Sequence, residues 1–333
     1  MSTHTPHNAL FIAVFSNPAD AAGELRSVLP EPVGQLIDWS SLQLRDGHFV
    51  DPALAESRTD LLYSATIRGS PCLLYLLFEH QSTVDPMLPL RLLRYMVSIW
   101  ERCVADQPSS TRVPPIIPVV LCHAEGGWRA ARRMRELYAV DPAGLEGLRD
   151  WLPDFGIVLE DLFTEHDQVL MARQLTALSQ LALLLLKHGR SEQLLDKLVS
   201  WAHLLGAVLI GPEGMQRMGH VVSYVLHMTG RATAEQLVQI LRPQLGDPIR
   251  EVVMTEAERL EAIGEARGKV EGKAEGKAEG KALSVIAILE ARGIPIGDGV
   301  RNRVMGCRDL AQLDKWIARA VSCTRAEELF SSG

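Results

Sequence analysis

The stretch DLLYSATIRGSPCLLYLLFEHQ, residues 60–81, predicts a β-hairpin with a carboxylate at each outer end. Two runs rich in leucine, aromatic and β-branched residues flank Arg68-Gly-Ser-Pro71, which has the composition of a turn. If Arg68 faces Pro71, Asp60 lies opposite Glu79. A four-residue loop that pairs Ile67 with Cys72 gives the same register.

Two carboxylates in facing positions require an explanation, because directly opposed side chains have Cβ atoms about 4.5–5.5 Å apart and like charges there repel. A divalent cation shared by Asp60 and Glu79 would turn this repulsion into binding. Gln81 lies two residues beyond Glu79, so its side chain would point to the same face of the sheet as the two carboxylates. The spacing therefore predicts an Asp…Glu-x-Gln site for Mg²⁺. This depends on the register, since a slip of one residue would separate the carboxylates.

Composition predicts a globular chain with a full core, in two or more domains. It has 333 residues, 47% hydrophobic and 23% charged, with a net charge of −7. The apolar run at 181–186 is far shorter than the roughly 20 residues that span a bilayer, so no membrane association is expected. No Lys or Arg precedes the apolar residues 9–15, which argues against a signal peptide. Five cysteines without a C-x-x-C motif predict reduced thiols, no structural zinc and a cytoplasmic location.

The distribution of positive charge limits the chemistry. The first lysine is Lys187, so no lysine from the earlier part of the chain can serve at the hairpin. The negative net charge of the chain repels DNA, so any contacts with phosphate must come from local patches of arginine. Candidates lie on a predicted amphipathic helix over 87–105 and a predicted basic helix over 128–138: Arg91, Arg94, Arg129, Arg132 and Arg133. Exposed arginines that balance an acidic domain would give the same pattern.

The order of predicted elements indicates an α/β core. Helices over 8–15 and 18–29 precede the hairpin, and a buried strand over 113–122 and a last strand over 155–162 follow the helix over 87–105. We expect four parts: the α/β domain at 1–165, a helical region at 166–250, a long helix at 251–292 and a helical cap at 293–333.

The long helix contains Gly-Lys-Ala-Glu repeats. Glycine recurs every fourth residue from Gly264 to Gly280, beside Lys at 269, 273, 277 and 281 and Glu at 271, 275 and 279. Lys and Glu two residues apart lie on nearly opposite helix faces and cannot pair within one helix. A second copy could lay its Glu stripe along the Lys stripe, which predicts a homo-oligomer through residues 251–333. A flexible linker is the alternative, because glycine costs about 1 kcal/mol per helical position.

Four blocks resemble the bacterial recombination-promoting nuclease / putative transposase (Rpn) family of the PD-(D/E)XK nuclease superfamily. They are DLLY at 60–63, LLFEHQS at 76–82, RLLRYM at 91–96 and PIIPVVL at 115–121. The resemblance covers roughly residues 7–190.

The resemblance implies a restriction-endonuclease-like mixed sheet flanked by helices, which cuts DNA with Mg²⁺ or, in its place, Mn²⁺. Asp60 and Glu79 match the two acids of the motif, with the main-chain carbonyl of His80 as a third metal ligand. Gln81 stands where lysine is usual; its amide can orient a water or a phosphate but carries no charge. Glu24 is a weaker match to an extra acid found in many members of the superfamily.

The chain departs from the family pattern at its start, where His7-Asn8 and Phe11-Ile12 replace the usual His-Asp and Phe-Lys. The expected function is a Mg²⁺-dependent DNA endonuclease of low sequence specificity, linked to recombination. One alternative is a decayed nuclease that only binds DNA, which the changes at Asn8 and Ile12 favour. Another is an adaptor that oligomerises through its C-terminal helices.

Overall fold

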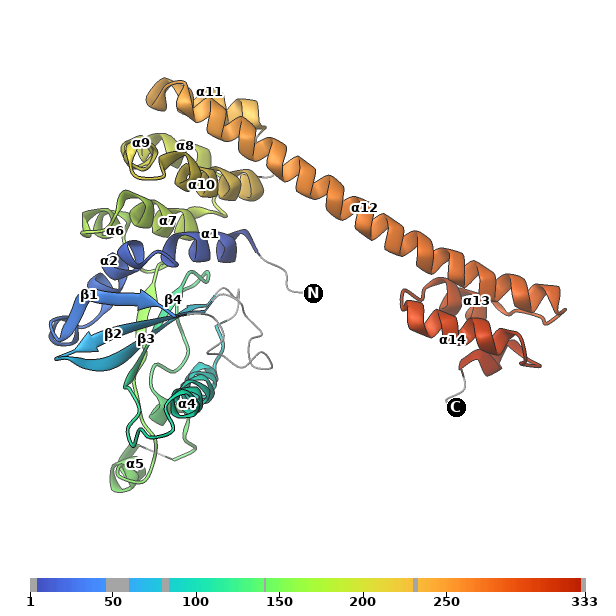
Figure 1. Ribbon diagram of the computed structural model, residues 1–333, viewed down its shortest axis with the longest axis horizontal. Coiled ribbons are helices and arrows are strands. Elements are labelled where there is room, and N and C mark those ends of the chain that lie inside the picture. The colour runs from blue at the N-terminus through green and yellow to red at the C-terminus, as the bar shows by residue number, and fades with distance from the viewer. Residues whose placement is uncertain (1–4, 46–59, 80–83, 141, 230–232, 331–333) are drawn as a thin grey trace. The chain divides into compact units, whose positions relative to one another are not determined.

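The computed structural model describes residues 5–45, 60–79, 84–140, 142–229 and 233–330, of which 75–79, 142, 143 and 267 are described for the backbone alone. A five-stranded mixed sheet forms the α/β core (Figure 1). In space as in sequence its order is β1 (Ile37–Leu44), β2 (Leu61–Ile67), β3 (Ser70–Glu79), β4 (Ile116–Cys122) and β5 (Val158–Asp161). The first three strands are antiparallel neighbours, whereas β3, β4 and β5 run parallel. This confirms the mixed α/β fold predicted from the sequence.

Helices cover both faces of the sheet. Because side chains alternate along each strand, neighbouring residues pack against helices on opposite faces. On one face, Leu61 and Tyr63 share a buried cluster with Phe11 and Phe15. Leu62 points the other way and joins the cluster of α4 (Leu88–Asp106), which also provides the crossover that parallel β3 and β4 require. The first face is covered by α1 (Pro6–Phe15) and α2 (Pro18–Val28), which both begin with proline after a capping Thr5 or Asn17.

The hairpin is present, but its predicted register is wrong by two residues. Ile67 pairs with Ser70, which leaves a two-residue turn of Arg68 and Gly69 with φ of 49° and 80°. Positive φ at both central residues is characteristic of a type I′ turn. The prediction failed because it allowed no left-handed conformation for Arg68. Because Leu61 faces Leu76, the same register places position 60 opposite 77 rather than 79. A shift of two positions preserves which positions share a face.

The predicted basic helix over 128–138 is also wrong. This stretch is irregular apart from the short 3₁₀ helix η2 (Met134–Leu137). Its backbone instead pairs with residues far along the chain: Ile157 N donates to Arg132 O (2.9 Å), and Met134 N donates to Phe155 O (3.1 Å). Arg129, Arg132 and Arg133 therefore do not share a helix face.

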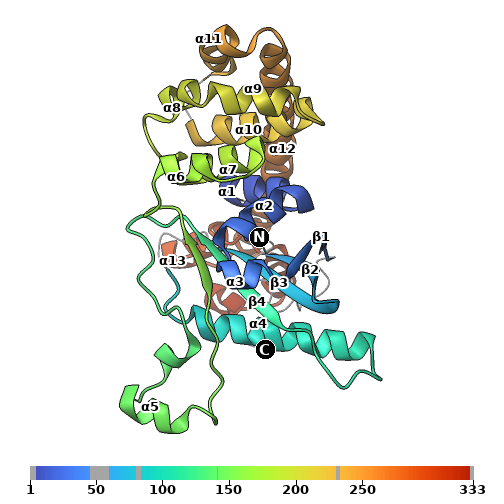
Figure 2. The same cartoon turned by 90° about the vertical axis from the view of Figure 1, so that its left-hand side faces the viewer.

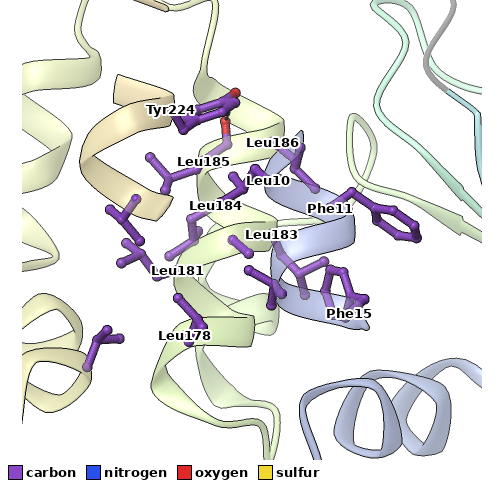
Figure 3. Packing of buried hydrophobic residues seen from close by; sticks show 14 of the residues in the cluster. Leu10, Phe11, Phe15, Leu178, Leu181, Leu183, Leu184, Leu185, Leu186 and Tyr224 are labelled. Carbon is purple, nitrogen blue, oxygen red and sulfur yellow. Dashed lines mark hydrogen bonds between the residues drawn. The ribbon is translucent and has the colours of Figure 1, made fainter. Parts of the chain in front are cut away.

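The helices that follow the sheet complete its core. They are α6 (Asp167–Ala172), α7 (Ala177–His188), α8 (Leu194–Ser200), α9 (Ala202–Ile210), α10 (Gly214–Thr229) and α11 (Ala234–Leu245). The leucines of α7 lie beside Leu10, Phe11 and Phe15 of α1 (Figure 3). A single buried cluster runs from Leu10 to Val253, and Met1–Ala257 forms one compact unit.

A second compact unit, Glu258–Gly333, has its own core. It contains most of α12 (Pro248–Ala291), together with α13 (Asp298–Met305), α14 (Leu310–Ala320) and η3 (Ala326–Phe330). Val285, Leu289, Leu313 and Trp316 are buried in this core. Within the described ranges, no helix has both the length and the apolar character needed to cross a bilayer.

Candidate functional site

The strand topology brings Asp60 and Glu79 to one end of the sheet. Asp60 directly precedes β2, and Glu79 is the last residue of β3. Since β2 and β3 are antiparallel, the start of one strand lies beside the end of the other. The parallel strand β4 ends there too, with Cys122 paired to Glu79. The site predicted from sequence is thus located at the carboxyl ends of β3 and β4.

Asp60 belongs to the face of the sheet that α4 covers. Continued alternation gives position 60 the side of Leu62, which packs in one cluster with Leu88 and Leu92 of α4. The Asp60 side chain is half-buried, and one of its carboxylate oxygens is fully buried. Such an oxygen is a hard ligand suited to Mg²⁺.

The rest of the predicted ligand set lies outside the described residues. This applies to the side chain of Glu79 and to the whole of His80 and Gln81. Among the residues that are described, no group of three or more His, Cys, Asp or Glu side chains is close enough to hold a metal. The Mg²⁺ site therefore stays a prediction that fits the donor type of Asp60 and the position of the β3 terminus.

Two candidate phosphate contacts lie on α4. Arg91 is half-buried and forms an ion pair with Asp85 (3.0 Å), whereas Arg94 is exposed. Of the other candidates, Arg129 donates to Gly126 O (3.3 Å), and Arg133 forms an ion pair with Asp154 (2.6 Å). These residues lie between β4 and β5 rather than on a common basic surface.

Glu24 of α2 lies in a buried group of charges, the Arg173 cluster, defined here as Arg173, Glu24, Glu160 and Glu165. The guanidinium of Arg173 is 3.6 Å from Glu24, 3.0 Å from Glu160 and 3.3 Å from Glu165. Burial, and secondly the charge of Glu160, raises the pKa of Glu24 to about 8. The protonated form of Glu24 is therefore favoured over that of an ordinary carboxyl group, and the cluster joins α2, β5 and the loop before α6.

Sequence reasoning missed a buried histidine pair at the same end of the sheet. His7 of α1 and His123, directly after β4, have ring centroids 4.6 Å apart. The hydroxyl of Tyr224 donates to Leu185 O (2.9 Å; Figure 3) and lies 2.9 Å from His7 Nδ1. The hydroxyl has one proton, which goes to the carbonyl, so His7 Nδ1 must donate. No local signal could reveal this, because Tyr224 follows His7 by 217 residues.

The neighbouring Asn8 marks the departure from the family pattern. Its backbone N–H donates to the hydroxyl of Thr5 (3.4 Å), while its side-chain Oδ1 is buried without a hydrogen bond among the described residues. A buried polar atom of this kind is uncommon in folded proteins. It lies one residue from the histidine pair, near the end of β4.

The comparisons with known proteins all point to one family. The family model described as "Putative transposase, YhgA-like" matches residues 5–211. Recombination-promoting nuclease RpnA of Escherichia coli (strain K12) is 27% identical over 308 residues, which cover 92% of this chain and 96% of RpnA. Recombination-promoting nuclease RpnD of E. coli O157:H7 is 32% identical over 122 residues, or 37% of this chain and 46% of RpnD.

A relative described as inactive also matches. The inactive recombination-promoting nuclease-like protein RpnE of E. coli (strain K12) is 29% identical over 124 residues, or 37% of this chain and 41% of RpnE. The chain thus spans nearly all of RpnA but less than half of RpnD and RpnE. No solved structure matches the chain. The resemblance to the Rpn family predicted from the sequence is confirmed.

Proposed function

The chain belongs to the family of YhgA-like putative transposases, and on this basis we propose that it is a Mg²⁺-dependent DNA endonuclease of low sequence specificity that acts in recombination. One structural observation carries the proposal: the fold brings Asp60 and the end of β3 to the same end of the sheet, on positions that side-chain alternation assigns to one face. Carboxylates at diagonal positions on one face of a sheet can share a divalent cation through their oxygens.

Each residue of the proposed site has a role that follows from its functional group. Asp60 and Glu79 would hold Mg²⁺ through carboxylate oxygens, with the main-chain carbonyl of His80 as a further ligand. When bound, Mg²⁺, or Mn²⁺ in its place, supplies charge to a phosphate oxygen and to the leaving oxygen and acidifies a bound water. Gln81 would orient a water or a phosphate through its amide. Arg91 and Arg94, on the helix that covers this face, would contact DNA phosphates.

A second candidate function is a DNA-binding protein that has lost catalysis. Asn8 and Ile12 replace the acid and the base of the family pattern, and a relative such as RpnE is described as inactive. Asp60, Glu79 and Gln81 favour the active enzyme, because a protein selected only for binding has no need of the paired acids.

The first experiment measures nicking of supercoiled plasmid by the purified full-length protein with Mg²⁺, Mn²⁺, Ca²⁺ or EDTA. We expect metal-dependent nicking that falls about 100-fold or more in Asp60→Asn and Asp60→Ala, because loss of a metal ligand removes several kcal/mol of transition-state stabilisation. The matched control is Asp196→Asn, an exposed acid of α8. Nicking that survives both Asp60 variants would overturn the proposed site, and absence of nicking from the native protein would favour the binding protein.

A further inference from the structure

A lobe between β4 and β5 extends from the sheet on the side of α4. We call residues 124–157 the α5 lobe, after its helix α5 (Pro142–Leu148). Both views place α5 beyond the sheet and α4 (Figures 1 and 2). The two legs of the lobe are joined by the backbone bonds Ile157 N to Arg132 O and Met134 N to Phe155 O, and by Tyr138, whose hydroxyl donates to Pro153 O (2.8 Å). The lobe is therefore a preformed structure.

The lobe contains a cavity of about 790 Å³. This volume lies in the range of about 300–1,000 Å³ that is usual for ligand sites. Arg133, Arg135 and Arg149 contribute positive charge to its lining, while Tyr138, Leu145 and Leu152 provide aromatic and apolar surface. Such a lining suits a ligand that combines a flat apolar part with an anionic group.

The acids of the cavity already have partners. Asp154 forms an ion pair with Arg133 (2.6 Å), Glu146 is 3.7 Å from Arg149, and Glu136 accepts a hydrogen bond from Arg132 N (2.9 Å). Among the described residues, the guanidinium of Arg135 has no ion-pair partner, and Arg133 Nε is a buried donor without an acceptor. A buried donor of this kind costs free energy until a ligand or water supplies an acceptor. The guanidinium of Arg135 is therefore available to an anion, whereas that of Arg133 is already paired with Asp154.

Trp151 adds an exposed aromatic surface to the α5 lobe. It lies in sequence between the lining residues Arg149 and Leu152, and 81% of its surface is exposed. Aromatic side chains of this kind serve as platforms on which unpaired bases stack. The adjacent acid Asp150 disfavours a phosphate beside the indole, so Trp151 is suited to the base and Arg135 to the phosphate.

We propose that the α5 lobe binds an unpaired segment of DNA, with a base stacked on Trp151 and a phosphate of the same strand held by Arg135. This rests on the proposed function in taking DNA as the ligand. It adds a substrate class: DNA that contains single-stranded stretches, such as gaps, flaps or open ends. Paired bases in duplex DNA are stacked on each other and cannot reach the indole, so duplex binds this lobe poorly.

The test measures binding of a labelled oligonucleotide to the full-length protein by fluorescence anisotropy in EDTA, where metal-dependent cleavage is absent. We expect the single-stranded form to bind more tightly than its duplex, and Trp151→Ala and Arg135→Ala each to weaken single-strand binding about tenfold. Arg135→Ala should also reduce the slope of log affinity against log salt by about 0.7, because one phosphate contact is lost. Trp151→Ala should leave that slope unchanged, because stacking releases no counterion.

Matched controls are Ile210→Ala, an 88% exposed apolar residue, and Arg190→Ala, an exposed arginine, both in the helical region. Single-strand binding that is equal in the native protein and both lobe variants, or that is weakened equally by the controls, overturns the proposal. The result is separable from the proposed nuclease. Loss of binding in the lobe variants supports the lobe even if plasmid is not nicked, and unchanged binding refutes it even if nicking depends on Asp60.

Discussion

Glu24 shows how burial decides the chemistry of a single carboxyl group. Its side chain is 1% exposed and shares the guanidinium of Arg173 with Glu160. Loss of hydration upon burial disfavours the charged form, and the nearby Glu160 adds to this, so the pKa rises from 4.5 to about 8. A protonated acid is a poor metal ligand at neutral pH. A role as an accessory catalytic acid would therefore require Glu24 to lose its proton within the cluster.

The raised pKa of Glu24 predicts how stability depends on pH. The folded state holds the proton more tightly than the unfolded state, so this contribution to stability is complete below about pH 4.5 and is lost as pH rises to about 8. Glu24→Gln keeps the shape of the protonated acid and removes the titration. We expect the variant to gain stability over the native protein as pH rises through this window, by on the order of a few kcal/mol.

Urea unfolding at a series of pH values from about 5 to about 9 measures the difference in stability between the variant and the native protein. The control is Glu192→Gln, an exposed acid in the helical region. A constant difference in unfolding midpoint between Glu24→Gln and the native protein across the series would contradict a raised pKa for Glu24.

The sequence predicted the places of Asp60 and Glu79 at the strand ends better than it predicted the contacts of the residues around them. The ends of β2 and β3 follow from local composition, so Asp60 and Glu79 were located correctly at one end of the sheet. Their register was wrong because it depends on the conformation of Arg68, which has a φ of 49°. The partner of Glu24 was not predictable, because Arg173 is far away in sequence and no local pattern links the two residues.

Among the elements, those with strong local signals were predicted well. Proline at the helix starts and regular apolar spacing gave α1, α2 and α4 close to their observed bounds. The strand β1 was missed because its sequence IDWSSLQL alternates weakly and lies mostly half-buried or exposed. The stretch 128–138 was mistaken for a helix because long-range pairing with residues 155–157 determines its conformation.

Helix α12 carries a charge pattern that selects one orientation of pairing. A Cβ added at any glycine from Gly264 to Gly280 would meet nothing within 4 Å, whereas Ala278 and Ala282 are buried in the core of the second unit. The glycines thus form an open stripe, called the glycine line, which winds by about 40° around the helix with each repeat. It is flanked by the Lys stripe on one side and the Glu stripe on the other, since residues one apart are about 100° apart. In a parallel symmetric pair opposite flanks meet, so Lys faces Glu. In an antiparallel pair like charges meet.

We therefore expect two copies of α12 to pair in parallel through the glycine line. A pyrene label on Ile263→Cys, where the native side chain is 51% exposed, should give excimer fluorescence because equivalent residues lie side by side. An antiparallel pair centred on Gly272 would separate the labels by about 27 Å, from a rise of about 1.5 Å per residue. The control is the labelled native protein, which reports any excimer from its own cysteines. An Ile263→Cys excimer no greater than this control would contradict parallel pairing.

At the scale of the whole molecule, the chain contains two compact units with separate cores. The first ends at Ala257 and includes the start of α12, where Ile249, Val252 and Val253 are buried against the core of the sheet and its helices. The second buries its own cluster from Ala278 to Leu329. The candidate site and the α5 lobe both lie in the first unit, while the glycine line lies in the second. The proposed cleavage site and the proposed pairing surface therefore lie in different units.

This division predicts that a chain ending at Ala257 folds, stays monomeric and keeps its nuclease site. The truncation removes no residue from the first core, so cooperative unfolding should persist. Mass measurement in solution should show an oligomer for the full chain and a monomer for residues 1–257. Nicking that depends on Asp60 should remain in the shortened chain, because Asp60, Glu79 and α4 are all retained. A shortened chain that still oligomerises would place assembly in the first unit, and loss of nicking on truncation would mean that cleavage requires two paired copies.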